Sequence, residues 1–290
     1  MAAPLLAVDA PSLLYRAFFA LPQSITDDDG QPVNALLGMA NLILFACERH
    51  EPRAVVLCWG AEAAAYRTEL FEPYHADRPP MPPELERQWR DAPGFFAAFG
   101  WQSALAGDLE ADDLLGSFAS VETAAGGRTL LFTGDRDMFQ CVSDDVTVLF
   151  PRGGKDGPEV VDAAGVRERY GIEPAQVPDF IALRGDPSDG LPGAKGIGAK
   201  TARDLLREHG TLEDVIAAAS KPGTMTARQA GALTSDPGAL RAFKDVATLR
   251  EIDVERPADT PLAAAAAAAA AAERGMNRLA ERLDAWPPAS

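Results

Sequence analysis

Short apolar runs alternate with longer amphipathic segments through the first half of the chain. The apolar runs have the length of buried strands and occupy residues 5–10, 54–60, 101–107, 128–135 and 146–150. Between them, apolar residues recur at helical spacing over residues 11–19, 34–50 and 111–122. Strands that alternate with helices in this way predict an α/β fold built on a mainly parallel sheet.

The second half of the chain has a different pattern. After about residue 160 the strand signals stop, and short helical segments separated by glycine and proline follow. We therefore predict a strand-containing core over residues 1–160 and a helical subdomain over residues 161–290. The alanine-rich stretch 258–286 is predicted to be a helix of that subdomain, weakened in its middle by Gly275.

The composition limits the class of protein. Three scattered cysteines and three histidines, without a C-x-x-C pair, argue against a zinc site or a disulfide framework. Residues 1–10 lack the basic region of a signal peptide, and no apolar run is long enough for a membrane span. We therefore expect a cytoplasmic, nucleoid-associated protein without membrane contact. The net charge of −16 argues against nucleic-acid binding, although residues 191–244 carry eight Lys/Arg against five Asp/Glu.

Carboxylates follow the predicted strands at the ends where a parallel sheet places its ligands. The acids in question are Asp9, Glu110, Asp112, Asp113, Asp135 and Asp137, with Asp186 and Asp189 from the helical part. Such a group repels itself unless cations neutralise it, and oxygen ligands favour Mg²⁺ or Mn²⁺. The second strand breaks the pattern, because it ends in Trp59-Gly60 and its first acid is Glu62.

The segment GAKGIGAKT, residues 193–201, comes within one residue of a phosphate-binding P-loop. Gly193 and Gly198 have the P-loop spacing, but Ala199 displaces Lys200 by one position. A P-loop also follows a strand, and Pro187 and Pro192 disfavour one here. A nucleotide-binding protein is therefore the weakest of the functional alternatives.

Five motifs, in order and spacing, resemble the flap endonuclease and 5′-nuclease family in its bacterial branch, related to the 5′-nuclease domain of DNA polymerase I. They are LLAVDAPSLLYRAFFALP (5–22), AYRTELFEPYHADRPPMPPEL (65–85), EADD (110–113), TGDRDMFQ (133–140) and LRGDPSDGLPGAKGIGAKTA (183–202). The resemblance runs from about Pro4 to Arg250. It implies a PIN-like core, a helical arch over about 66–100 in the long connection between two strands, and a helix–three-turn–helix motif over about 186–208.

The resemblance also implies roles for individual residues. One divalent metal ion is expected at Asp9, Glu110, Asp112 and Asp113. A second is expected at Asp135, Asp137, Asp186 and Asp189. Duplex DNA is expected at Lys195, Gly196, Gly198, Lys200, Thr201 and Arg203. A K⁺ ion in the same motif is expected at Ser188 and the main chain near Ile197. Residues expected to act on the reacting phosphate are Arg16, Arg67, His75 and Arg78.

Two positions depart from the family pattern. Gly60 stands where the family has an aspartate ligand of the first metal ion, and His75 replaces a lysine of the arch. His75 is therefore either a weaker cationic group or an exposed arch residue without a role. We predict a structure-selective 5′ nuclease, using one or two Mg²⁺ or Mn²⁺ ions on branched or 5′-ended duplex DNA. It is expected to be a monomer that acts with a DNA polymerase in trans. The alternative is a structure-specific DNA-binding protein with weak or no catalysis.

Overall fold

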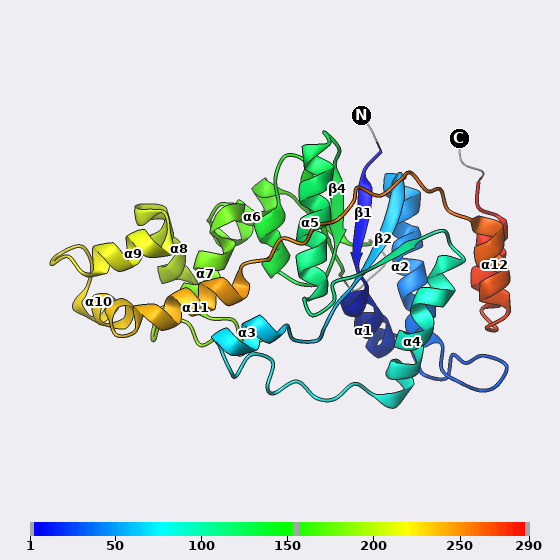
Figure 1. Cartoon of the computed structure of the whole chain (residues 1–290), viewed down its shortest axis with the longest axis horizontal. Helices are drawn as coiled ribbons and strands as arrows, with labels where there is room; N and C mark the ends of the chain where they lie inside the picture. Colours follow the sequence, from blue (N-terminus) through cyan, green and yellow to red (C-terminus); the bar gives the residue numbers. More distant parts are fainter. Residues whose placement is uncertain (1–2, 153–156, 288–290) are drawn as a thin grey trace.

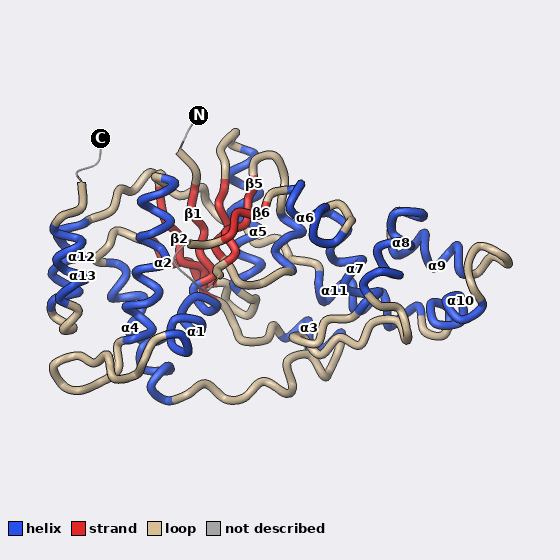
Figure 2. The backbone as a smooth tube through the Cα atoms, turned by 180° about the vertical axis from the view of Figure 1, so that it is seen from behind, coloured by secondary structure: helices blue, strands red, loops and turns tan. Residues whose placement is uncertain are grey.

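A six-stranded sheet lies at the centre of the computed structural model, which describes residues 3–152 and 157–287 (Figure 2). The strand order is β3-β2-β1-β4-β5-β6. The strands are β1 (Leu5–Asp9), β2 (Ala54–Trp59), β3 (Gln102–Leu105), β4 (Thr129–Phe132), β5 (Val146–Phe150) and β6 (Glu159–Val161). The first five are parallel, as the sequence predicted, whereas β6 pairs antiparallel with β5 and was not predicted. A three-residue edge strand is too short to show a periodic pattern.

Alternating side chains of the central strands belong to two separate hydrophobic clusters, one on each face of the sheet. Leu6 and Val8 of β1 pack with helices α1 (Ala10–Ala20), α2 (Asn34–His50) and α4 (Pro83–Ala97). Leu5 and Ala7 face the other side, where α5 (Ala111–Ala124) and parts of the helical region cover the sheet. Both faces of the sheet are therefore covered at its centre, which explains why β1 and β2 are continuous apolar runs, whereas the edge strand β3 is not.

Short helices extend away from the sheet and form the helical part that the sequence predicted (Figure 1). They are α6 (Ala163–Tyr170), α7 (Val177–Arg184), α8 (Ala199–His209), α9 (Leu212–Ala219), α10 (Ala227–Thr234) and α11 (Pro237–Ala247), with the 3₁₀ turns η1 (Asp137–Cys141) and η2 (Pro174–Gln176). Helix α7 lies among the others and is buried over most of its length. It connects the sheet to the DNA-binding motif predicted from the sequence.

The predicted arch contains less free helix than expected. Only α3 (Ala65–Leu70) stands away from the sheet, and residues 71–82 form a long turn-rich connection (Figure 1). Helix α4 belongs to the core, since Phe95 and Phe96 are fully buried. Its Gln88 side chain also accepts hydrogen bonds from the first-turn amides of Ala35 and Leu36, at 2.8 and 3.2 Å. The part of the arch that stands away from the core is therefore confined to α3 and the connection that follows it.

The C-terminal segment corrects two predictions. It forms two helices, α12 (Ala264–Ala272) and α13 (Asn277–Asp284), because Gly275 adopts a φ of 69° at the break. These helices do not join the helical subdomain: they return to the first face of the sheet, beside α4 and α2 (Figure 2). The Arg282 guanidinium holds them there through an ion pair of 2.9 Å with Glu48. Within the described ranges, no helix is long and apolar enough to cross a membrane.

An extended segment, residues 248–263, connects α11 to α12 and is called the strap here (orange in Figure 1). It donates backbone hydrogen bonds to Asp113 Oδ1 from Arg250 and to Ser117 Oγ from Ile252. Further along, Arg256 pairs with Glu122, a fully buried carboxylate of α5 that also pairs with Arg53. The strap therefore fixes the C-terminal helices to α5 and β2 by polar contacts.

Candidate active site

The carboxyl end of β1 points the first acid toward β4. Asp9 ends β1 and caps α1, since its Oδ1 accepts a hydrogen bond of 3.0 Å from the Ser12 amide. Its Oδ2 accepts a bond of 2.6 Å from the hydroxyl of Thr133, just after β4. Burial raises the pKa of Asp9, and these two hydrogen bonds oppose that shift.

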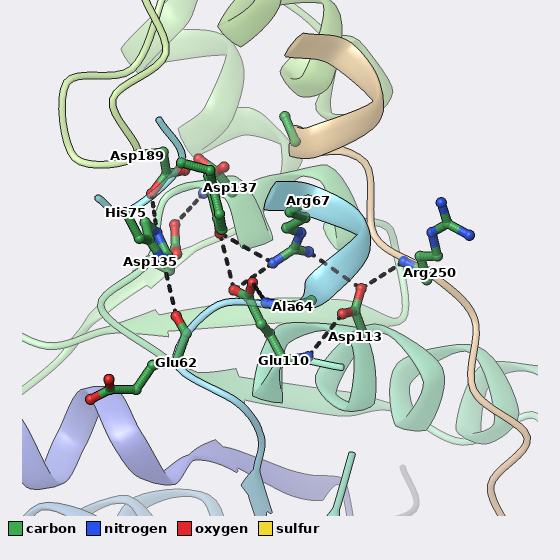
Figure 3. A network of polar contacts seen from close by, with 12 residues as sticks. Glu62, Ala64, Arg67, His75, Glu110, Asp113, Asp135, Asp137, Asp189 and Arg250 are labelled. Atoms are coloured by element: carbon green, nitrogen blue, oxygen red, sulfur yellow. Dashed lines mark hydrogen bonds and ion pairs between the residues drawn. The ribbon is translucent and has the colours of Figure 1, made fainter. Parts of the chain in front are cut away.

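A small pocket opens beside Asp9, and acidic side chains line it. Asp112 comes from the first turn of α5, Asp135 and Asp137 follow β4, and Asp189 lies in the loop before α8. Arg67 and Tyr74 line the opposite wall. Figure 3 shows Asp135 and Asp189 beside His75, with Asp137 between them and Arg67.

The carboxylates in and around the pocket disturb one another. Burial raises the pKa of Asp112 and Asp137 well above the ordinary value for aspartate, and the charge of Asp135 adds to both shifts. Burial also raises the pKa of Asp135 to about 6, and the charges of Asp189, Asp9 and Asp186 add to that shift. We call the whole group the acid rim: Asp9, Glu110, Asp112, Asp135, Asp137, Asp186 and Asp189. The rim holds more negative charge than its burial tolerates without a cation.

The donor chemistry of the acid rim fits a hard divalent cation, because it offers only oxygen ligands. In the part of the chain that the structure describes, however, no three His, Cys, Asp or Glu side chains are arranged as ligands of one metal ion. The residues present therefore fit a cation by charge and ligand type, although their carboxylates are not gathered around one point.

Arg67, predicted from the resemblance to act on the reacting phosphate, forms a buried ion pair with acids of α5. Its side chain is only 4% exposed, and its Nη1 pairs with Glu110 Oε2 at 2.5 Å. Its Nη2 lies 3.3 Å from Asp113 Oδ1 (Figure 3). Burial lowers the pKa of Arg67, but the charges of Glu110, Tyr74 and Asp113 outweigh burial and leave the pKa raised. Arg67 is therefore engaged by carboxylates of the protein while it lines the pocket, and its contact with phosphate stays a prediction.

Asp113, predicted from the resemblance as a metal ligand, is also engaged by groups of the protein. Its side chain is fully buried, and Oδ1 accepts hydrogen bonds from Arg67 and from the Arg250 amide at 2.7 Å. Its Oδ2 accepts a bond of 3.2 Å from the Glu110 amide in a capping box at the start of α5. Both oxygens face protein donors rather than the pocket.

Glu110 belongs to the rim by position, yet protein groups occupy it as well. Its Oε1 accepts the Ala64 amide at 2.8 Å, and its Oε2 accepts the Tyr74 hydroxyl at 3.0 Å in addition to Arg67. Neither tyrosine of this region, Tyr66 or Tyr74, was predicted from the sequence. The only signal was their place in the arch motif, which does not reveal which acid they contact.

Gly60 carries a packing constraint that the sequence did not indicate. A Cβ atom at this position would lie 2.4 Å from the Ala111 amide nitrogen and 2.7 Å from the Glu110 Cα. Real Cβ atoms do not approach backbone so closely, so any side chain here would displace the start of α5. The close approach of α5 therefore leaves no room for the aspartate that the family has at this position. Substitution at Gly60 alone cannot restore a metal ligand.

His75 ties the arch connection to the rim and is not the exposed residue that one alternative expected. Its side chain is 5% exposed, with Nε2 2.9 Å from Asp189 Oδ1. Its Nδ1 lies 2.9 Å from the Glu62 carbonyl oxygen, and its ring stacks on Tyr74 at a centroid distance of 3.7 Å (Figure 3). Arg78 reaches the same Asp189 at 3.7 Å and is half exposed.

Two other predicted residues lie near this site. Arg16 is exposed on α1. The Glu62 side chain accepts a hydrogen bond of 3.3 Å from the hydroxyl of Tyr15, the residue before Arg16. Glu62 therefore faces α1 rather than the pocket.

The predicted helix–three-turn–helix motif follows α7 directly. An isolated bridge pairs Asp186 with Leu191, and Gly193 and Gly196 adopt φ values of 66° and 81° in the turns before α8. Among the predicted DNA contacts, Lys195, Gly196, Gly198 and Lys200 are exposed, and Thr201 and Arg203 are half-buried. Lys200 and Arg203 both pair with Asp204, at 2.8 Å each, so part of their charge is neutralised within α8.

The two residues predicted to bind K⁺ lie on either side of these turns. The Ser188 hydroxyl donates a hydrogen bond to Asp186, and its amide donates another of 2.9 Å. Ile197 is 3% exposed, so only its main chain is available to an ion. Asp186 also pairs with Arg184 at 2.8 Å, which leaves it less free than Asp112 or Asp137 to bind a cation.

The sequence profile of 5′-3′ exonucleases covers almost the whole chain. The N-terminal, resolvase-like domain matches residues 4–171, and the C-terminal SAM fold matches residues 172–269. The chain belongs to the 5′-3′ exonuclease family. The resemblance inferred from the five motifs is thereby confirmed.

Two relatives illustrate the range of the family. A 5′-3′ exonuclease of Streptomyces coelicolor is 38% identical over 229 residues, which cover 74% of this chain and 75% of that protein. A thermostable DNA polymerase I of Thermus thermophilus is 41% identical over 211 residues, or 73% of this chain. The match covers 25% of that polymerase, so the chain spans about a quarter of the polymerases it matches.

Solved structures with the same fold include two nucleases. A complex of the bacteriophage T5 flap endonuclease with DNA and metal ions has a TM-score of 0.69 and 18% identity, covering 97% of both chains. The catalytic core of Rad2 with a DNA substrate has a TM-score of 0.59 and 14% identity, covering 98% of this chain and 88% of that one. The predicted core with a helical extension is therefore the fold of this family.

Proposed function

We propose that the chain is a metal-dependent, structure-selective 5′ nuclease that hydrolyses phosphodiesters in branched or 5′-ended duplex DNA. The observation that carries the proposal is the acid rim: acids from four separate segments meet at the carboxyl ends of β1 and β4. Membership of the 5′-3′ exonuclease family supports the same reaction class.

Four residues would hold the cation: Asp112, Asp135, Asp137 and Asp189 line one pocket. Bound Mg²⁺ or Mn²⁺ supplies a Lewis acid for the phosphoryl oxygens and for an attacking water. Asp9 stands beside this set, fixed by Ser12 and Thr133. Glu110 is already paired with Arg67, so we propose that the first of the two predicted metal sites is weak and that one cation is bound tightly.

Other groups of the chain orient the substrate. His75 and Arg78 gather at Asp189 and would place cationic donors beside a phosphate that enters under the arch connection. The turns at Gly193 and Gly196, with the exposed Lys195 and Lys200, would grip the backbone of the duplex. A K⁺ ion held by the Ile197 main chain and the Ser188 hydroxyl would serve the same grip. Exposed Arg16 would meet the 5′ end from α1.

A protein that acts on branched or 5′-ended DNA is expected to work close to DNA and to a DNA polymerase. We propose that the protein works as a monomer near cytoplasmic DNA, and that a DNA polymerase acting in trans fills the gap behind it. The relative from Thermus thermophilus carries its matching segment inside a polymerase, which supports a polymerase context.

Cleavage of a labelled 5′-flap duplex tests the activity. Wild type with Mn²⁺ or Mg²⁺ is expected to release a product, and Asp135→Asn is expected to lower the rate by at least about 10²-fold, because loss of a residue that only supports a metal ligand already costs about 10- to 100-fold. Asp108→Asn, an exposed acid before α5, is the matched control. No product from wild type, or equal rates for wild type and Asp135→Asn, would contradict the proposal.

The alternative, a DNA-binding protein without catalysis, is not favoured, because six of the seven rim acids are aspartates still gathered around the pocket. Gly60→Asp cannot decide between the two, since a Cβ at that position collides with α5.

A further inference from the structure

A group of four arginines lies beyond β4 and β5, on the side of the acid rim that faces the helical part. They are Arg136 after β4, Arg152 after β5, Arg169 at the end of α6 and Arg184 at the end of α7. We propose that this group, called the arginine surface here, binds the phosphate backbone of the DNA duplex between the helix–three-turn–helix motif and the acid rim. The proposal rests on the proposed function and names the surface along which its substrate lies.

Aromatic rings hold three of these guanidinium groups in place. Arg169 lies over Phe139 at 5.2 Å and over Phe150 at 5.9 Å. Arg136 lies over the same Phe150, also at 5.9 Å. Arg184 lies over Phe180 at 5.3 Å. A guanidinium stacked on a ring keeps its edge donors available, and that planar edge matches two phosphate oxygens.

The rings themselves form one continuous row, which brings three of the arginines onto a single surface, and Arg152 joins them through Glu159, which it shares with Arg169. Tyr170 is 6.1 Å from Phe139 and 5.4 Å from Phe180 between ring centroids. Burial raises the pKa of Tyr170, and the positive charges of Arg136, Arg184 and Arg169 all oppose that shift. Three of the four arginines therefore act on one side chain at close range.

The surface carries more positive than negative charge. Arg152 and Arg169 share a single acid, Glu159, at 2.6 and 2.7 Å. Arg184 pairs with Asp186, whereas Arg136 makes no ion pair with any residue that the structure describes. Four guanidinium groups thus face two paired carboxylates, in a protein whose net charge is −16. An acidic protein that gathers four arginines against two carboxylates at one place presents a local attraction for polyanions.

The position of the arginine surface indicates that its partner is duplex DNA. Arg136 stands between Asp135 and Asp137 in the chain, and Arg184 contacts Asp186, so one end meets the acid rim. At the other end, Gly171 follows α6 and lies against Arg203 of α8: a Cβ there would be 2.4 Å from the Arg203 Cδ. The arginines therefore bridge the predicted DNA grip and the pocket, and a duplex held by both must pass over them.

Binding of a 5′-flap duplex, measured by fluorescence anisotropy in EDTA over a range of salt, tests the surface without cleavage. Each phosphate contact contributes about 0.9 to the slope of log K against log salt for duplex DNA. Arg136→Gln and Arg152→Gln are chosen because both side chains are exposed, and their double variant is expected to lower the slope by about 1 to 2. A weakening of the Kd by about 5- to 50-fold near 0.15 M salt is expected to accompany it.

Arg167→Gln is the matched control, since Arg167 lies on the same helix as Arg169 but pairs with Glu173 away from the rings. It is expected to bind as wild type does. An unchanged slope in the double variant overturns the inference, as does an equal loss in Arg167→Gln, which would reflect net charge alone. Cleavage of the same duplex by wild type with Mn²⁺ is measured in parallel. Cleavage with an unchanged slope rejects the arginine surface only, and no cleavage rejects the proposed function.

Discussion

The Arg67 guanidinium lies between two carboxylates at the start of α5, 2.5 Å from Glu110 Oε2 and 3.3 Å from Asp113 Oδ1. Asp113 also holds the strap through the Arg250 amide. One buried cation therefore links the base of the arch, the capping box of α5 and the C-terminal strap. This arrangement gives Arg67 a structural role that a phosphate-binding arginine would not have.

Arg67→Met is expected to destabilise the protein, because it leaves two buried carboxylates without their cation. Breaking a buried ion pair on one side costs about 3–5 kcal/mol. The free energy of unfolding from urea denaturation measures the effect. Arg78→Met, which removes a half-exposed arginine near the same rim, is expected to cost about 1 kcal/mol or less. Unchanged stability with weaker DNA binding in Arg67→Met would contradict the structural role and show that Arg67 binds the phosphate.

Gly60→Ala is expected to destabilise by about 1–3 kcal/mol or more, the usual cost of forcing an extra group into packed structure. The added methyl would meet the backbone of Glu110 and Ala111. Gly94→Ala is the control, since nothing lies within 4 Å of its added Cβ in helix α4. That change is expected to stabilise by up to about 1 kcal/mol through helix propensity. Equal effects of the two substitutions on the thermal midpoint would show that Gly60 is not constrained.

Asp135→Asn is expected to change how stability depends on pH. The folded pKa of Asp135 is raised to about 6, so its contribution is intact below its ordinary pKa near 4 and is lost as pH rises through 6. The metal-free variant is therefore expected to match wild type at pH 4 and to melt at a higher temperature at pH 8. Mn²⁺ is expected to stabilise wild type more than the variant at pH 8.

Asp108→Asn is the control for this comparison and is expected to melt as wild type does at every pH. A calorimetric titration of wild type with Mn²⁺ at pH 8 is expected to give about one tight site per chain, because Glu110 and Asp113 are committed to Arg67. Two tight sites of similar affinity would contradict that reading of the rim.

Glu122→Gln is expected to loosen the strap. Glu122 is fully buried, and Arg256 binds it through two nitrogens, each at 3.0 Å, while Arg53 binds it from β2's side. Loss of its charge leaves two arginines without a buried partner, at a cost of about 3–5 kcal/mol at pH 7. Glu255→Gln, an exposed neighbour on the strap, is expected to change stability by about 0.5 kcal/mol or less.

The pH dependence of the stability of Glu122→Gln provides a second test. Burial raises the pKa of Glu122, but hydrogen bonds from Arg53 and Arg256 outweigh burial and leave the pKa lowered. Its contribution is therefore present above the ordinary glutamate pKa and is lost as pH falls below it. The difference between wild type and Glu122→Gln is expected to shrink on acidification. A difference that grows toward low pH would contradict the assigned ion pairs.

The parallel sheet and the acid rim were predictable because both depend on local patterns. Apolar runs of strand length located β1, β2, β4 and β5, and Asp9 and Asp135 follow such runs directly. The direction in which a side chain turns was not predictable. Asp112 and Asp113 are neighbours in sequence, yet one faces the pocket and the other faces Arg67, because successive residues of a helix point about 100° apart.

Contacts between distant segments account for the remaining differences. The constraint on Gly60 comes from the backbone of residues 50 positions later, and no pattern around Gly60 records it. The return of α12 and α13 to the sheet depends on contacts such as Arg282 with Glu48, which are 234 positions apart in the chain. Alanine indicated helix there correctly, but it gave no information on the partner of that helix.

The late position of α12 and α13 in the chain has a consequence for protein synthesis. The ribosome makes α2 and α4 long before the two helices that cover part of their apolar surface. During that interval the sheet can already form, while one of its faces lacks its outer helices. Nascent chains with exposed apolar surface are prone to aggregate. A ribosome stalled before residue 264 should therefore carry an intermediate that still exposes the apolar surface that α12 and α13 cover in the complete fold.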